Sequence, residues 1–397
     1  MSVVNIYPYF AISALLLVVA WAVSRRTRFY RELLAVEDRA NRFHAIDGLR
    51  GFLALGVFFH HAVISYFYYA TGRWELPPSR FYTLTAEVGV ALFFMITAFL
   101  FWNRGLTARP ELEARKFYWS RICRLVPMYL FSVACVFGVA YWVTGFEFSQ
   151  SIRDLFRESM KWVSFGFLNP YDLNGLRHSW VLNSVYWTLA YEWMFYLFLP
   201  LGLLFARSIG FVLLVLIASV FIHAAYAVKP VEWNFLFGAV AAVLSSEYRW
   251  SAWRFWRSRI ASVFVLVALV LFFAAFDRGY GLAQASLLFP IFLCIANGND
   301  LWGLLAAAPS RLLGTISYSI YLMHSIVLFG VLWWLNQYVP IAGMGALEYW
   351  LLISVVGVLV VIICSATYRV IEHPLLRTPI PKWLGVHAGE STTGTGQ

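Results

Sequence analysis

Arg50 and His61 stand in one apolar stretch of the sequence, and their types and spacing could do chemistry. Ionisable side chains within membrane segments are costly and are therefore functional candidates by default. His61 follows Arg50 by eleven residues, a step about 20° past three full turns of an α-helix and about 16 Å along its axis. A helix over residues 48–68 would therefore present both side chains on one face. A cation near one membrane surface, with an imidazole deeper on the same face, suits an anionic carrier whose reactive end reaches inward.

Two further ionisable residues, Glu192 and His324, fall near the middle of predicted membrane spans, as His61 does. An isolated carboxylate at this depth is expensive, so Glu192 needs a partner or a wet cavity. The two histidines are the obvious candidates. Hydrogen bonding between helices is an equal alternative for His324, and a structural role is favoured for His60, which lies about 80° from the Arg50 face.

Arg121 and Arg124 occupy positions i and i+3 just before a predicted span at 126–144. This spacing places both guanidinium groups on one helix face, where they could clamp a phosphate. The alternative is an ordinary basic anchor on the cytoplasmic side of the membrane. Spacing alone favours the anchor.

Composition predicts an all-α, polytopic helical membrane protein. Of 397 residues, 61% are hydrophobic and 13% charged, too few charges to cover a soluble domain. Apolar segments predict about eleven transmembrane helices. They lie near 7–24, 48–68, 85–103, 126–144, 182–205, 209–228, 231–246, 259–276, 281–297, 316–336 and 348–368.

The distribution of basic residues predicts the orientation. With the N-terminus outside and the C-terminus cytoplasmic, 22 of the 30 Lys and Arg residues fall on the inside, as expected for a protein of the plasma membrane (the bacterial inner membrane). The net charge of +10 therefore reflects topology, and no nucleic-acid partner is predicted. The four cysteines are scattered and show no metal-ligand spacing, so neither a metal site nor a disulfide framework is expected.

Six segments, in order, resemble the membrane-bound acyltransferase family 3, which O-acylates cell-surface and secreted carbohydrates and some antibiotics. The most specific of these segments contains the Arg50–His61 pair. The chain departs from the family pattern at two positions: Trp193 stands where members often have an acidic residue, and Ile326 where many have a proline. The resemblance implies a ten-span core, to which this chain adds one N-terminal span. It divides the chain into an anchor and basic cytoplasmic linker (1–42), the acyltransferase membrane domain (43–376) and a cytoplasmic tail (377–397). The six segments lie at 47–61, 89–100, 121–127, 187–192, 316–324 and 368–374.

The resemblance also implies the reaction: transfer of an acyl group, expected to be acetyl, from cytoplasmic acyl-CoA to a hydroxyl of a saccharide or lipid-linked saccharide. No tightly bound cofactor is expected. Arg50, Arg121 and Arg124 would bind the CoA phosphates. His61 would be the general base or, alternatively, a covalent acyl-His relay, and Glu192 would orient its imidazole. Weaker candidates for lining the cavity or binding the acceptor are His324, Tyr318, Ser317 and His60.

A rival class remains at this point: a transporter or lipid-carrier flippase that uses His and Glu within the membrane as a proton relay. The inner-face arginines aligned with His61, and the absence of a visible inverted repeat, favour the enzyme. The acceptor stays open among surface polysaccharide, exopolysaccharide, lipid-linked sugar and secondary metabolite. Acyl length and oligomeric state are open as well.

Overall fold

The computed structural model describes residues 2–39, 43–107, 114–170, 172–204, 230–246, 253–379 and 381. Over these ranges the chain is helical, and the one β feature is an isolated bridge between Leu173 and Leu176. The longer helices are α1 (Tyr7–Arg26), α2 (Arg28–Arg39), α3 (His44–Thr71), α4 (Arg80–Thr107), α5 (Ala114–Val143), α6 (Ile152–Val163), α7 (Trp187–Leu204), α9 (Glu232–Ser246), α11 (Arg259–Ala275), α12 (Leu282–Ala296), α13 (Ala308–Thr315), α14 (Ser317–Asn336) and α15 (Ala346–Thr367).

Six described helices are long and apolar enough to cross a membrane: Tyr7–Arg26, His44–Thr71, Arg80–Leu106, Phe117–Val143, Ser317–Asn336 and Ala346–Leu376. The apolar helices α11 and α12 are shorter. The predicted class, a helical membrane protein, is therefore confirmed, whereas the count of eleven spans stays a prediction. The predicted span at 209–228 lies outside the described residues.

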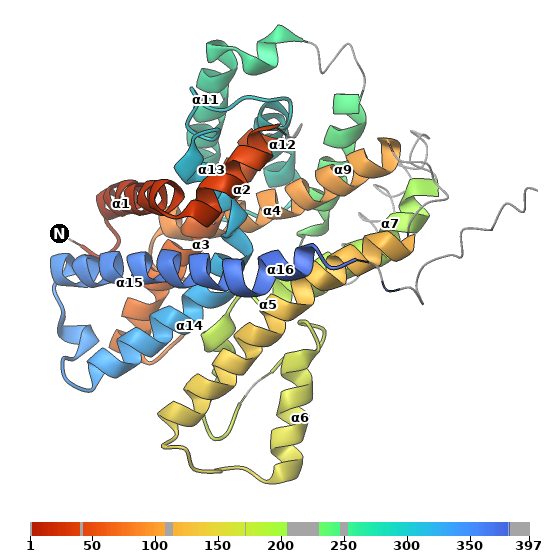
Figure 1. Cartoon of the computed structure of the whole chain (residues 1–397). Coiled ribbons are helices and arrows are strands. Elements are labelled where there is room, and N and C mark those ends of the chain that lie inside the picture. Colours follow the sequence, from red (N-terminus) through yellow and green to blue (C-terminus); the bar gives the residue numbers. More distant parts are fainter. Residues whose placement is uncertain are drawn as a thin grey trace, which may run out of the picture.

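Helix α3 lies at the centre of the helix bundle. Its residues from Leu53 to Ser65 are all buried, and it packs against α4, α13 and α14. Helices α14 and α15 lie side by side, and α6 projects from the body on the loops that follow α5 (Figure 1). The helix that carries Arg50 and His61 is thus enclosed by others, as an internal site requires.

Two glycines bring the start of α3 into backbone contact with the segment around α13. A Cβ atom on Gly314 would lie 1.6 Å from the carbonyl oxygen of Asp47, and one on Gly48 would lie 1.9 Å from that of Leu305. Only a residue without a side chain permits this approach. The contact fixes the position of Arg50, which lies two residues after Gly48.

We predict that Gly314→Ala lowers the melting temperature of the purified protein in detergent. Overpacking of a close contact costs about 1–3 kcal/mol. Gly138→Ala is the matched control, because Gly138 lies inside α5 with no atom within 4 Å of its added Cβ. That variant should keep or raise the melting temperature, since alanine favours a helix over glycine by about 1 kcal/mol. Equal melting temperatures for the two variants would contradict the close packing of α3 and α13.

Three local predictions need correction. The predicted span 182–205 is broken: a 3-10 helix (Ser179–Asn183) is followed by a turn, and α7 begins at Trp187. Within that turn the Ser184 hydroxyl bonds side chains of other helices. Glu192 is therefore in the second turn of α7, not mid-span.

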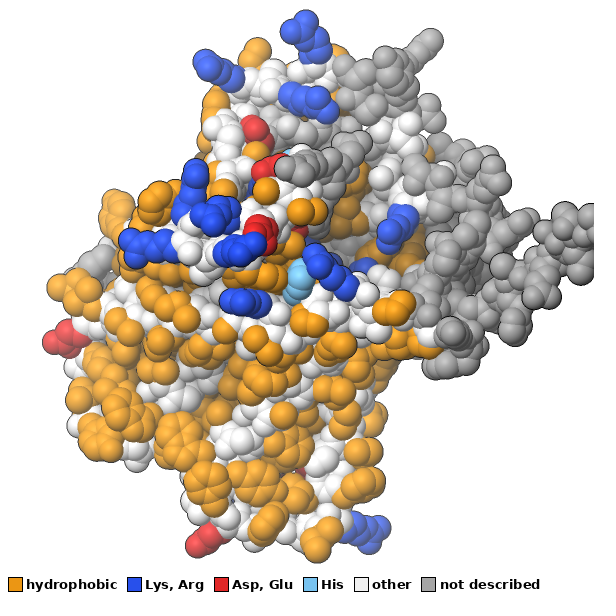
Figure 2. All heavy atoms as spheres, in the orientation of Figure 1, with side chains coloured by type: hydrophobic (Ala, Val, Ile, Leu, Met, Phe, Trp, Pro, Cys, Tyr) orange, Lys and Arg blue, Asp and Glu red, His pale blue; other side chains and the backbone are white. Residues whose placement is uncertain are grey.

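Arg121 and Arg124 lie on α5 as expected for one helix face, but inside the candidate span Phe117–Val143 rather than just before it. The predicted basic linker contains helix α2, whose Tyr30 hydroxyl donates to the carbonyl of Ser365, 2.6 Å away. Figure 2 shows basic side chains gathered over α2 and toward the end of α15, while the surface over α14 is mostly hydrophobic. Helix α2 is thus an ordered part of a basic face.

Candidate active site

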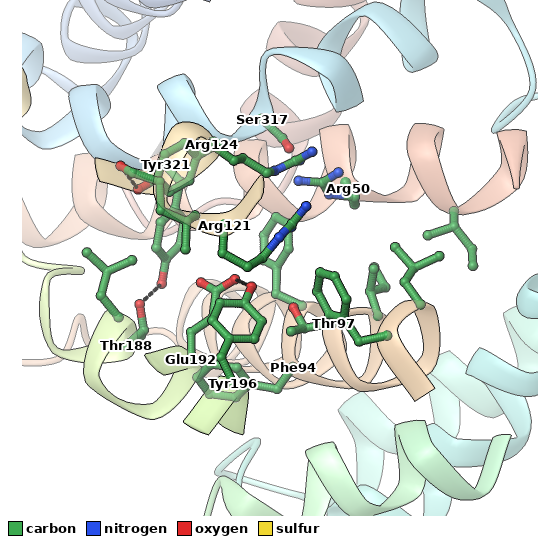
Figure 3. A pocket seen from close by; sticks show the side chains of 18 of the residues that line it. Arg50, Phe94, Thr97, Arg121, Arg124, Thr188, Glu192, Tyr196, Ser317 and Tyr321 are labelled. Atoms are coloured by element: carbon green, nitrogen blue, oxygen red, sulfur yellow. Dashed lines mark hydrogen bonds between the residues drawn. The ribbon is translucent and has the colours of Figure 1, made fainter. Parts of the chain in front are cut away.

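Three arginines converge on a cavity of about 520 Å³, which we call the arginine pocket (Figure 3). Arg50 comes from α3, and Arg121 and Arg124 come from α5. Helices α4 and α7 and the first turns of α14 complete the lining. Its polar and charged residues include Asp47, Arg50, Arg104, Arg121, Arg124, Thr188, Glu192, Tyr196, Ser317, Tyr318 and Tyr321.

The arginine pocket carries more positive than negative charge, with four guanidinium groups against two carboxyl groups. Arg121 lies over the ring of Phe101, 4.6 Å from its centroid, a contact that holds a guanidinium in place. The fully buried Ser317 hydroxyl has no hydrogen-bond partner among the described residues and lies beside Arg124 (Figure 3). A buried hydroxyl without a partner is costly, so this pocket suits a polyanion that brings acceptor atoms.

Glu192 lies in the arginine pocket rather than beside a histidine. Its carboxylate accepts a hydrogen bond from the Tyr196 hydroxyl one turn further along α7, and the nearby Arg121 side chain points its guanidinium toward Arg50 and Arg124 (Figure 3). The expected pairing of Glu192 with His61 is not present. The cause is the break before α7, which begins only at Trp187 and presents Glu192 to the arginine pocket.

A second cavity, of about 270 Å³, contains His61; we call it the histidine pocket. Its lining combines Trp and Tyr rings with aliphatic side chains and two carboxyl groups. The Trp74 ring stacks on the His61 ring with centroids 6.2 Å apart, and Trp180 meets Trp74 edge-on. The lining includes His60, His61, Trp74, Glu75, Glu87, Trp180, Ser184, Trp187, Tyr280 and Tyr321.

A chain of hydrogen bonds fixes the roles of the His61 nitrogens. The backbone carbonyl of Ile320 can only accept, so His324 donates to it through Nδ1, at 2.9 Å. Nε2 of a neutral His324 is then an acceptor, and His61 Nδ1 donates to it, also at 2.9 Å. His61 Nε2 is left with a lone pair, 2.9 Å from the Ser184 hydroxyl. His61 is thus oriented as a base, with His324 behind it.

The two pockets meet at a wall made by α4 and α14. Val90 and Tyr321 line both cavities, and the Tyr321 hydroxyl lies 3.0 Å from the Thr188 hydroxyl (Figure 3). Arg50 and His61 therefore share α3 but open into different pockets. The space in front of the shared face of α3 is divided by side chains from neighbouring helices.

Two further predicted site residues, Tyr318 and His60, each line one of the pockets and bond a backbone carbonyl. Tyr318 lines the arginine pocket and donates to the carbonyl of Leu125 at 2.9 Å. His60 lines the histidine pocket and bonds the carbonyl of Tyr82 at 3.0 Å, outside the His61 chain. Among the described residues, no group of three His, Cys, Asp or Glu side chains is placed to hold a metal ion.

Sequence reasoning missed Tyr196, Tyr321 and Ser184. Tyr196 follows Glu192 by four residues, a helical spacing that could have identified the pair. Tyr321 lies three residues before His324, a helical spacing that could likewise have identified it. Ser184 gave no signal, because its partner His61 is 123 residues away.

A family model described as an acyltransferase domain matches residues 43–369. The chain belongs to this acyltransferase family. The chain is similar to YrhL of Bacillus subtilis (strain 168), which is provisionally named a peptidoglycan O-acetyltransferase. The two are 27% identical over 374 residues, which cover 83% of this chain. The chain spans about half (54%) of the length of YrhL. The ORF330 protein of Acidianus two-tailed virus, provisionally named an acetyltransferase, is 26% identical over 75% of this chain and 87% of its own length. No solved structure matches.

The chain is a membrane acyltransferase, because it belongs to this family and its described residues include six apolar helices long enough to span a membrane. It bears out the resemblance drawn from the six sequence segments. It also favours the enzyme over the transporter or flippase.

Proposed function

We propose that this acyltransferase moves an acetyl group from acetyl-CoA to a hydroxyl of a saccharide, in the plasma membrane of a bacterium. The donor enters the arginine pocket from the cytoplasm, and the acceptor occupies the histidine pocket from the opposite side. The observation that carries the proposal is the His61 Nε2 lone pair, held by His324 in the pocket that adjoins the arginines. The proposal keeps the predicted N-out, C-in orientation.

The charge of the arginine pocket supports the donor. CoA carries several phosphate charges, and a cluster of Arg50, Arg121 and Arg124 offers planar, charge-assisted hydrogen bonds to them. Arg50 and Arg124 also line a further cavity of about 280 Å³, which leaves room on both sides of the two guanidinium groups. A phosphate here would also give the Ser317 hydroxyl the partner that it lacks. The pantetheine arm then extends toward Tyr321 and the wall.

The lining of the histidine pocket supports the acceptor. Sugar rings present C–H groups that stack on the electron-rich faces of aromatic rings, and Trp74 and Trp180 offer such faces. A carboxylate such as that of Glu75 accepts hydrogen bonds from sugar hydroxyls, whereas the Glu87 carboxylate is engaged by Arg278 and the Gly279 N–H. The name of YrhL refers to O-acetylation of a glycan, which agrees with a saccharide acceptor.

The chemical step needs a base and a passage. His61 Nε2 takes the proton of the hydroxyl that attacks the thioester carbonyl, and it returns that proton to the departing thiolate. His324 holds the imidazole in the required tautomer, the role that a carboxylate plays in a serine hydrolase triad. The thioester reaches this nitrogen between Val90 and Tyr321, once the Tyr321 side chain turns aside.

The test is release of CoA thiol by the purified full-length protein given labelled acetyl-CoA. Peptidoglycan fragments and a chito-oligosaccharide serve as acceptor probes. We expect thiol release and label on one of these glycans, and little release without an acceptor. Thiol release that no glycan probe stimulates would contradict the saccharide assignment. Absence of release under all conditions would contradict acetyl transfer from CoA.

Trp74→Ala tests the acceptor assignment separately. We predict a roughly tenfold rise in KM for the glycan probe, since the loss of about 1.4 kcal/mol of stacking corresponds to a factor of ten. The KM for acetyl-CoA should stay unchanged, because Trp74 does not line the arginine pocket. Trp21→Ala, an exposed tryptophan of α1, is the control. A rise in the donor KM alone would place the acceptor elsewhere.

A further inference from the structure

We propose that Ser184 is an acyl carrier: the acetyl group passes from CoA to Ser184 Oγ, and from there to the acceptor. This inference rests on the proposed function and adds a covalent intermediate on a residue that neither the sequence motifs nor the related proteins indicate. It replaces the acyl-histidine alternative with an acyl-serine. His61 then serves both half-reactions as the base.

Ser184, His61 and His324 are arranged as a nucleophile, its base and the group that orients the base. Ser184 Oγ lies 2.9 Å from His61 Nε2, and His61 Nδ1 lies 2.9 Å from His324 Nε2. Nucleophile and base within hydrogen-bond reach, with a third group orienting the base, identify an activated serine. Here a histidine, fixed by its bond to the Ile320 carbonyl, takes the place of the usual carboxylate.

The surroundings of Ser184 differ from those of an ordinary membrane-helix serine. Ser65 on α3 bonds the carbonyl four residues earlier in its own helix, the His61 carbonyl, at 2.7 Å. Ser184 instead bonds the side chains of His61 and Ser325. It is half-buried and lines the histidine pocket. The serine is therefore accessible to a substrate and already aligned with a base.

The position of Ser184 in the chain explains what a covalent relay would achieve. It occupies the turn before α7, and Thr188, four residues later, lines the arginine pocket. This short segment thus has one end in each pocket. An acetyl group on Ser184 has crossed the wall at Tyr321, so the acceptor need never meet the bulky CoA.

The two half-reactions balance without any further reagent. In the first, Ser184 Oγ attacks the thioester carbonyl while its proton passes to His61 Nε2; the carbon–sulfur bond breaks, and the thiolate leaves with that proton as free CoA. In the second, the acceptor hydroxyl attacks the acetyl-serine carbonyl and gives its proton to His61 Nε2. The Ser184–acetyl bond then breaks, and Ser184 Oγ takes the proton back.

The experiment incubates the full-length protein with labelled acetyl-CoA in the absence of an acceptor, then maps the label by peptide mass spectrometry. We expect acetyl on Ser184, lost when the glycan probe is added. Ser184→Ala should carry no label there and should lose acetyl transfer about 100-fold or more, because removal of a serine nucleophile costs at least as much as removal of a general base. Ser286→Ala, an exposed serine of α12, should match wild type.

Ser184→Cys guards against a misfolded alanine variant, because it keeps a nucleophile of similar size. We expect it to carry acetyl as a thioester, released by neutral hydroxylamine, whereas the wild-type ester resists. Wild type without label at Ser184, or Ser184→Ala within threefold of wild-type transfer, would overturn the relay and leave the proposed function standing. Wild type that releases no CoA thiol with any probe would overturn the proposed function, and the relay with it.

Discussion

Replacement of His61 by alanine is expected to lower acetyl transfer about 10²–10⁴-fold, the usual range for a general base. The reason is geometric: His61 Nε2 lies 2.9 Å from Ser184 and is backed by His324. No other described ring in the histidine pocket has this pair of partners. The measurement is kcat with labelled acetyl-CoA and the glycan probe, for protein purified in detergent.

His60→Ala is the matched comparison, because it removes the adjacent ring from the same pocket. The His60 ring bonds the Tyr82 carbonyl, outside the His61 chain, so we expect a smaller loss. Size-exclusion profile and melting temperature should remain near wild type in both variants, since each site already adjoins a cavity. Equal losses of kcat in the two variants would remove the special role of His61.

The helices were predictable from the sequence because each apolar stretch must satisfy its own backbone hydrogen bonds inside a bilayer. The predicted stretches at 7–24, 259–276 and 316–336 differ from α1, α11 and α14 by two residues or fewer at each end. Prediction failed where a polar side chain interrupts an apolar stretch, as Ser184 does before α7. Apolarity alone does not distinguish a continuous helix from two helical pieces joined by a turn.

The arrangement of the site was less predictable than the fold. Helical spacing places Arg50 and His61 on one face of α3, but Val90 of α4 and Tyr321 of α14 divide the space in front of that face. The partner of Glu192 depends on where α7 begins, which its own sequence does not state. Local periodicity thus identifies residues that could act together, while packing between distant segments decides which of them do.

Replacement of Arg50 by alanine is expected to raise the KM for acetyl-CoA about 10–100-fold, with a smaller change in kcat. Hydrogen bonds to charged groups contribute about 1.5–3 kcal/mol, and 1.4 kcal/mol corresponds to a factor of ten. Arg50 lines both cavities on the arginine side. Arg157→Ala, on the exposed face of α6, is the control for a general loss of positive charge.

A second donor makes the Arg50 test specific for phosphate. Acetyl-dephospho-CoA lacks the 3′-phosphate but retains the thioester, so wild type should use it less well than acetyl-CoA. If Arg50, Arg121 or Arg124 binds that phosphate, the alanine variant of that arginine must lose this preference, because removal of either partner removes the same interaction. A variant that binds both donors equally weakly identifies the contact.

The opposite outcome is that all three variants, Arg50→Ala, Arg121→Ala and Arg124→Ala, keep the full preference for acetyl-CoA. This would show that the 3′-phosphate lies elsewhere, and that these cations bind the pyrophosphate or only hold the pocket open. The kcat values separate these last two outcomes, because a collapsed pocket would lower kcat for both donors, whereas a lost pyrophosphate contact would raise both KM values in parallel.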